Sequence, residues 1–317
     1  MRPNSVGRSN GALVRVNQNG FRCTAIKPDT SKAGWLLLGD SVTMGIGVEE
    51  DSTFAGILQS RFHQVNIFNP SMIGFNVRDY ARASRHYIGE RMNDLKIRRI
   101  VLFWCLNDLY SDRDTIEMPG GKLRLRAGKA MNVLRAHSRF YFFLKTVLFD
   151  RSKSFYLHDS RLYTEDRSRV ADAINRLEEI KRSCMSRRHP GSGTRTARRA
   201  PNQDRLNSIE FMVVLLPYEY QLRVRNRGLD EPQRILSAEL EDRGIEVLDA
   251  LPYLKTSGID SKVLYLYGDG IHLSATGHRA VADFLITYIQ SPDPAFLQVA
   301  APSRIGCPDS AAHSKER

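Results

Sequence analysis

The chain has 317 residues, of which 42% are hydrophobic, and its formal net charge is +12. This length fits one α/β domain with insertions, and the apolar content is enough for a buried core. The positive charge favours anionic partners such as nucleic acid, anionic lipid or acidic polysaccharide, but it indicates no particular chemistry.

Membrane and targeting segments are not expected. No stretch reaches the roughly 18 apolar residues that a membrane span needs. The first 22 residues carry positive charge without the apolar centre of a signal peptide. As written, the sequence predicts a cytoplasmic location, whereas an upstream start would place the protein in the periplasm or at a membrane. The four cysteines form no C-x-x-C pair, so we expect free thiols rather than a zinc knuckle.

Short apolar runs alternate with stretches of helical periodicity along the chain. The runs predict five buried strands, at 34–40, 64–70, 98–106, 209–217 and 244–250. Helices are predicted at 52–62 with Ser52 as the N-cap, 77–95, 164–185 with Thr164 as the N-cap, 230–244 and 274–290. This alternation predicts an α/β protein, with a parallel five-stranded sheet between two helical layers.

Three segments interrupt the alternation within a main domain expected at 34–290, which a lead-in at 1–33 precedes. The insertion 109–163 contains a basic, aromatic helix candidate at 129–149. We interpret that helix as a lid or packing element, the alternative being a surface for an anionic membrane or a polymeric substrate. The Arg-rich stretch 186–208 and the tail 291–317 predict disorder. No recognition helix accompanies the Arg-rich stretch, so nucleic acid is not an expected partner.

Ser41 follows the first predicted strand in the sequence Gly-Asp-Ser. Ligands of parallel α/β sheets bind beyond the carboxyl ends of the strands, which is where this serine lies. A serine is a poor nucleophile at neutral pH unless a base activates it. The alternative is that Ser41 only caps a helix.

The best candidate for the base is His272, in the segment "YGDGIH" ahead of the last predicted helix. Asp269 lies three residues earlier, close enough in a tight loop to orient the imidazole. His278 is a rival base, and Asp108 and Asp249 are rival acids. The backbone N–H of Ser41, the backbone N–H of Gly74 and the side-chain amide of Asn107 are candidate donors to an oxyanion.

Four short motifs in this order resemble the blocks of the SGNH hydrolases, the GDSL-like lipase and esterase superfamily. They are "GDS" at 39–41, Gly74, "LND" with Asn107, and "DGIH" at 269–272. The resemblance implies a flavodoxin-like α/β/α fold, a Ser41–His272–Asp269 triad and an oxyanion hole made by Ser41, Gly74 and Asn107. The family's third block usually has glycine two residues before the asparagine, where this chain has Cys105.

The sequence therefore predicts a serine esterase that cleaves an O-acyl ester, such as an acetyl group on a carbohydrate, through an acyl-enzyme on Ser41. No metal or organic cofactor is expected. An O-acyltransferase that uses the same residues on a polysaccharide is one alternative. A non-catalytic protein that binds acidic polymers through its charge is the other.

Overall fold

A computed structural model describes residues 1–22, 29–110, 150–186, 209–224 and 227–290. The helix predicted at 129–149, the loop predicted at 186–208 apart from its first residue, and the tail 291–317 lie outside the described residues. Within the described part of the chain, no helix combines the length and the hydropathy needed to cross a bilayer.

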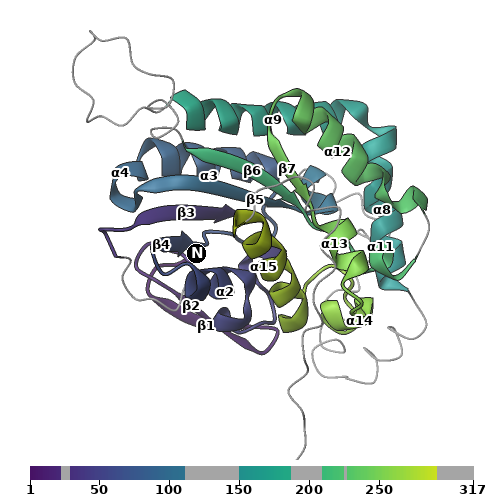
Figure 1. Ribbon diagram of the computed structural model, residues 1–317, viewed down its shortest axis with the longest axis horizontal. Helices are drawn as coiled ribbons and strands as arrows, with labels where there is room; N and C mark the ends of the chain where they lie inside the picture. The colour runs from purple at the N-terminus through teal and green to yellow at the C-terminus, as the bar shows by residue number, and fades with distance from the viewer. Residues whose placement is uncertain (23–28, 111–149, 187–208, 225–226, 291–317) are drawn as a thin grey trace, which may run out of the picture.

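A five-stranded parallel sheet forms the centre of the molecule (Figure 1). Its strands lie in the order β4-β3-β5-β6-β7, which is the 2-1-3-4-5 order of flavodoxin-like sheets. Each predicted apolar run matches one strand, although β3 and β5 begin one residue before their runs. The strands are β3 Ala33–Leu38, β4 Val65–Phe68, β5 Ile97–Trp104, β6 Glu210–Leu215 and β7 Glu246–Asp249.

Helices cover both faces of this sheet (Figure 1). On one face α3 (Val77–Gly89) and α12 (Glu231–Asp242) pack against α9 (Arg167–Ser186). On the other face α2 (Phe54–Arg61) and α13 (Ala250–Thr256) pack against α15 (Ala275–Gln290). The predicted three-layer α/β/α architecture is therefore confirmed. The shorter helices are α1 Ser41–Met44, η1 Glu50–Ser52, α4 Met92–Leu95, η2 Leu106–Leu109, α11 Glu219–Arg223, η3 Arg227–Asp230 and α14 Ser261–Leu264.

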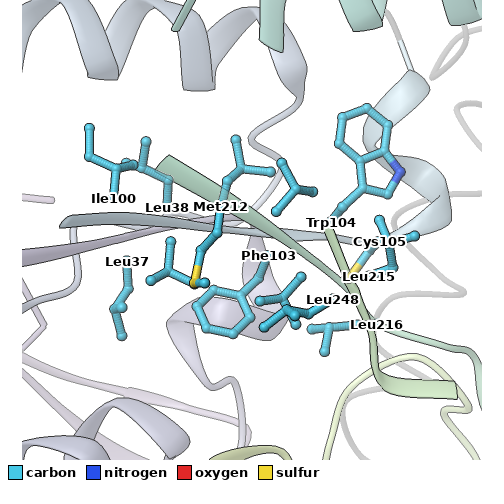
Figure 2. Packing of buried hydrophobic residues seen from close by; sticks show 14 of the residues in the cluster. Leu37, Leu38, Ile100, Phe103, Trp104, Cys105, Met212, Leu215, Leu216 and Leu248 are labelled. Carbon is cyan, nitrogen blue, oxygen red and sulfur yellow. The ribbon is translucent and has the colours of Figure 1, made fainter. Parts of the chain in front are cut away.

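Apart from Arg98 and Arg99 of β5 and Glu210 of β6, the central strands β3, β5 and β6 are apolar, because helices bury both of their faces. Figure 2 shows Leu37 and Phe103 on one side of the sheet and Ile100 and Trp104 on the other, as the alternation of side chains along a strand requires. All four side chains are buried. This packing makes the sheet a rigid support for the loops at the carboxyl ends of its strands.

Two predicted helix boundaries are wrong. The cap of α2 is Thr53 instead of Ser52, and its side chain accepts a hydrogen bond from the N–H of Gly56 at 3.1 Å. The predicted helix 77–95 divides into α3 and α4, with Gly89 as the last residue of α3. Glycine is a poor helix former, which explains a break at this point.

The predicted helix 164–185 is also corrected. Thr164 lies inside α8 (Arg151–Glu165), and α9 begins at Arg167. Asp166 separates the two helices, because its side chain accepts a hydrogen bond from the N–H of Arg169 at 3.0 Å. The last part of the predicted insertion 109–163 is therefore a helix that packs against the rest of the fold.

The lead-in begins with a hairpin of β1 (Ser5–Ser9) and β2 (Ala12–Val16). Arg22 follows this hairpin and pairs with Val16. Arg22 is buried, and its guanidinium donates to the carbonyl oxygens of Met44 at 2.6 Å, Gly45 at 2.5 Å and Val48. It also forms an ion pair with Glu50, with 2.9 Å between Nε and Oε2. Arg22 thus attaches the lead-in to the segment that follows Ser41.

Replacing Arg22 by methionine keeps much of the apolar volume but leaves Glu50 and three carbonyl groups without their partner. Removing one member of a buried ion pair typically costs about 3–5 kcal/mol, so we expect the free energy of unfolding of R22M to fall by that amount. Urea unfolding followed by circular dichroism measures it. Arg15 is exposed on β2, and R15M should change the stability by less than about 0.5 kcal/mol. Equal losses in the two variants would contradict the structural role of Arg22.

Candidate active site

Ser41 is the first residue of α1, directly beyond the carboxyl end of β3. Asp40 caps this helix, and its Oδ1 accepts a hydrogen bond from the N–H of Val42 at 2.8 Å. Gly39 permits the sharp turn, because a Cβ there would lie 1.9 Å from Oγ1 of Thr43. The turn therefore presents the Ser41 hydroxyl at the edge of the sheet.

Ser41, His272 and Asp269 form a continuous chain of hydrogen-bonding atoms. The Ser41 Oγ lies 2.8 Å from His272 Nε2, and His272 Nδ1 lies 2.9 Å from Asp269 Oδ1. The side chains of His272 and Asp269 are each 22% exposed, so a substrate can reach the imidazole. The structure thus brings together the three residues that the sequence nominated as nucleophile, base and orienting acid.

Hydrogen bonds within the loop that carries Asp269 and His272 fix its conformation. Asp269 Oδ1 accepts hydrogen bonds from the backbone N–H groups of Ile271 at 3.0 Å and His272 at 2.8 Å. Gly270 has φ +83°, and a Cβ at this position would lie 2.4 Å from the Cβ of Ser152. Glycine is therefore required where the loop meets α8, and this contact fixes the position of the carboxylate.

The contacts between His272 and Asp269 also shift the pKa values of both groups. Burial by itself would lower the pKa of His272, but the hydrogen bond and the charge of Asp269 outweigh it and raise that pKa. Burial would raise the pKa of Asp269, but the hydrogen bonds and charge of His272 outweigh it and lower that pKa. Asp269 is thus kept ionised, and it makes the imidazole a stronger base.

The rival residues have other partners. Asp108 is buried and accepts hydrogen bonds from the N–H of Cys105 at 2.8 Å and the hydroxyl of Tyr80 at 2.8 Å. Asp249 caps α13. Nδ1 of His278 accepts a hydrogen bond from the N–H of Phe54 at 3.2 Å, and burial lowers the pKa of His278 to about 3. Each of these three side chains therefore has a structural role, because it binds the protein's own backbone or a neighbouring side chain.

The candidate oxyanion donors follow the carboxyl ends of β3, β4 and β5, which are neighbouring strands of the sheet. Asn107 Nδ2 is 3.4 Å from Asp40 Oδ2, and Ser41 Oγ lies 3.3 Å from the same oxygen. Gly74 is exposed on the loop after β4 with φ +80°, a conformation that favours glycine. Asn107 is therefore placed beside the nucleophile, whereas the role of Gly74 as a donor stays a prediction.

Cys105, the departure from the family's third block, is buried at the end of β5. Burial, with the charges of Asp40 and Asp108 beside it, raises the pKa of its thiol well above the usual value. The thiol therefore stays protonated at neutral pH and does not compete with Ser41 as a nucleophile. In the part of the chain that the structure describes, no group of His, Cys, Asp and Glu side chains is arranged to hold a metal ion.

Sequence reasoning missed Tyr218, whose hydroxyl lies 3.1 Å from Oδ1 of Asn107, and Asp159, which contacts that tyrosine. Tyr218 follows β6 just as Ser41 follows β3. The rule that ligands bind at the carboxyl ends of parallel strands could have drawn attention to it. Asp159 lies on α8, where nothing in the sequence pattern indicated proximity to the site.

No protein-family model and no curated protein matches the chain. Solved structures similar to it include LAE5, an alpha/beta hydrolase enzyme from the metagenome of Lake Arreo, Spain (13% identity, 82% of this chain and 96% of that chain, TM-score 0.44). A member of the lipolytic protein G-D-S-L family from Veillonella parvula is 13% identical over 82% of this chain and 99% of that chain, with TM-score 0.44. The acetyl xylan esterase AlAXEase is 13% identical over 81% of this chain and 99% of that chain, with TM-score 0.41.

Replacing Asp269 by asparagine removes the charge that raises the pKa of His272 but keeps the shape of the side chain. The base must be neutral to accept a proton, so activity rises with pH through the pKa of His272. We expect the rising limb of kcat/KM in D269N to move to lower pH, with a loss of about 10²- to 10⁴-fold on the plateau. A pH–rate profile with a chromogenic ester measures both effects.

Asp249 offers the matched control, because asparagine also caps helices well. D249N should leave the rising limb where it is in the wild type. A limb that stays in place in D269N would show that Asp269 does not set the pKa of the catalytic base.

Proposed function

We propose that the chain is a serine hydrolase of the SGNH, or GDSL-like, type that cleaves an O-acyl ester through an acyl-enzyme on Ser41. The single observation that carries the proposal is the contact between Ser41 Oγ and His272 Nε2 at 2.8 Å, with Asp269 on the other ring nitrogen. A serine that only caps a helix has no need of a histidine positioned in this way.

The first half of the reaction transfers the acyl group to the protein. Ser41 Oγ attacks the ester carbonyl carbon while His272 Nε2 takes the hydroxyl proton. Asp269 holds the imidazole so that Nε2 faces Ser41, and its charge stabilises the imidazolium. When the C–O bond to the alcohol breaks, His272 returns the proton to the leaving oxygen, and the acyl group remains on Ser41.

The second half repeats these roles with water. His272 removes a proton from a water molecule that attacks the acyl carbon, and the Ser41 oxygen leaves and takes the proton back. In both halves a negative charge develops on the carbonyl oxygen. We assign its stabilisation to the N–H of Ser41, the N–H of Gly74 and Nδ2 of Asn107.

We propose that the substrate is an uncharged ester. Two exposed hydrophobic side chains, Ile73 and Tyr267, belong to the loops that carry Gly74 and Asp269. Apolar surface on these loops favours contact with acyl or alcohol groups. That the alcohol is a carbohydrate stays a prediction, which a panel of acetylated sugars and p-nitrophenyl esters tests. Product analysis with an added glycan acceptor distinguishes hydrolysis from acyl transfer.

Ser41→Ala should abolish labelling by a fluorophosphonate probe and lower the hydrolysis of a short p-nitrophenyl ester by at least about a thousandfold. The probe reports an activated serine, and the ester reports turnover. Ser84 is a buried serine on α3 whose hydroxyl has no hydrogen-bond partner within the described structure, so S84A should label and turn over like the wild type. A folded wild type that does not label, or an S41A variant that still turns over ester, would contradict the proposal.

Asn107→Ala should lower kcat by about 10²- to 10³-fold and change KM little, because an oxyanion donor acts on the transition state. Steady-state kinetics with the same ester give both parameters. A rise in KM at unchanged kcat would instead assign Asn107 to substrate binding.

A further inference from the structure

Three polar side chains from separate parts of the chain lie in a row that begins at Asn107, the candidate oxyanion donor, and continues through Tyr218 to Asp159. Tyr218 Oη is 3.1 Å from Oδ1 of Asn107 and 2.6 Å from Oδ2 of Asp159. Asn107 belongs to η2, Tyr218 directly precedes α11, and Asp159 lies on α8. Tyr218 is fully buried and Asp159 is 1% exposed, so these contacts are made away from bulk water.

The hydrogen atoms of this row can be assigned by counting. A tyrosine hydroxyl has one proton, but Oδ1 of Asn107 is an acceptor and an ionised Asp159 offers only acceptors. With the amide of Asn107 oriented as in the structure, every partner is satisfied if Asp159 carries a proton on Oδ2. That proton is then donated to Tyr218 Oη, and the Tyr218 hydroxyl donates to Asn107. Burial raises the pKa of Asp159 against the hydrogen bonds of Tyr110, Tyr218 and His158, in keeping with this assignment.

The other oxygen of Asp159 is fully engaged as well. Oδ1 accepts a hydrogen bond from the hydroxyl of Tyr110 and lies 3.0 Å from Nδ1 of His158. Asp159 is therefore held from two sides by residues outside the row. It presents only Oδ2 to Tyr218, which fixes where the tyrosine hydroxyl lies.

The direction of this donation matters for Asn107. The two ends of a side-chain amide have nearly the same shape, but only the NH2 end can donate to an oxyanion. A hydroxyl that donates from behind can be accepted only by Oδ1, so Nδ2 must face the opposite way. On that side Nδ2 lies 3.4 Å from Asp40, next to Ser41.

We propose that Tyr218, held in place by Asp159, is a positioning residue that keeps the Asn107 amide turned with its NH2 group toward Ser41. The inference rests on the proposed function, because the direction of this amide affects turnover only if Asn107 stabilises an oxyanion. Tyr218 itself touches neither substrate nor the reacting atoms.

The central test is Tyr218→Phe, which removes the donor and keeps the ring. We expect kcat for a p-nitrophenyl ester to fall about 10- to 100-fold with KM within about twofold, because a misplaced donor loses part of its effect on the transition state. Tyr156→Phe is the matched control. Tyr156 is a buried tyrosine of α8 whose hydroxyl donates to the carbonyl oxygen of Leu229 at 2.9 Å, and Y156F should keep kcat within about twofold.

A double-mutant cycle separates positioning from general support of the fold. If Tyr218 acts through Asn107, Y218F should lower kcat no further in an N107A background. A purely structural role would give the same fold-loss in both backgrounds, and that result would overturn the inference.

Asp159 gives an independent pair of variants should Y218F fold poorly. Asp159→Asn keeps a donor toward Tyr218 and an acceptor toward Tyr110, so its kcat should stay within about threefold of the wild type. Asp159→Ala removes both and should behave like Y218F. Equal kcat in D159N and D159A would overturn the inference. Loss of turnover in S41A together with unchanged kcat in Y218F would overturn only the inference, whereas full turnover in S41A would overturn the proposed function.

Discussion

The hydrogen bond between Ser41 and His272 joins residues 231 positions apart, and the geometry of the candidate site depends on it. Its two ends are held by different means. Ser41 is held from β3 by a turn that Asp40 caps. His272 is held by a loop whose backbone N–H groups converge on Asp269. The sheet fixes the first end, and contact with α8 at Gly270 fixes the second.

Several carboxyl groups are buried at the edge of the sheet near this site. Asp40, Asp108 and Asp159 are each about 1% exposed or less, and burial raises the pKa of all three. Each one accepts hydrogen bonds from the backbone or from a tyrosine hydroxyl, which offset the cost of removing it from water. A carboxyl whose pKa is raised by folding stabilises the folded state at low pH. That contribution is lost as the pH rises from the unfolded pKa through the folded one.

The sequence was most informative where a residue's environment follows from its own neighbours. The apolar runs located every strand of the sheet, because strands covered by helices on both faces are mostly apolar. The end of β3 located Ser41, and the spacing of three residues brought Asp269 to His272. Helix ends were less predictable, since Ser52 and Thr53 compete for the same cap and only packing decides between them. Arg22, Asp159 and Tyr218 were missed because their partners are distant in sequence and are set by tertiary structure alone.

The attachment of Arg22 to the carbonyl groups after Ser41 has a consequence for cooperativity. Opening the lead-in at Arg22, which pairs with Val16 of β2, would leave buried acceptors without their donor in the segment that follows the nucleophile. Local opening at the beginning of the chain and disorder of the nucleophile's loop therefore carry a shared free-energy cost, and the two regions belong to one cooperative folding unit. Truncation that removes Arg22 would thus act on the site as well as on the lead-in.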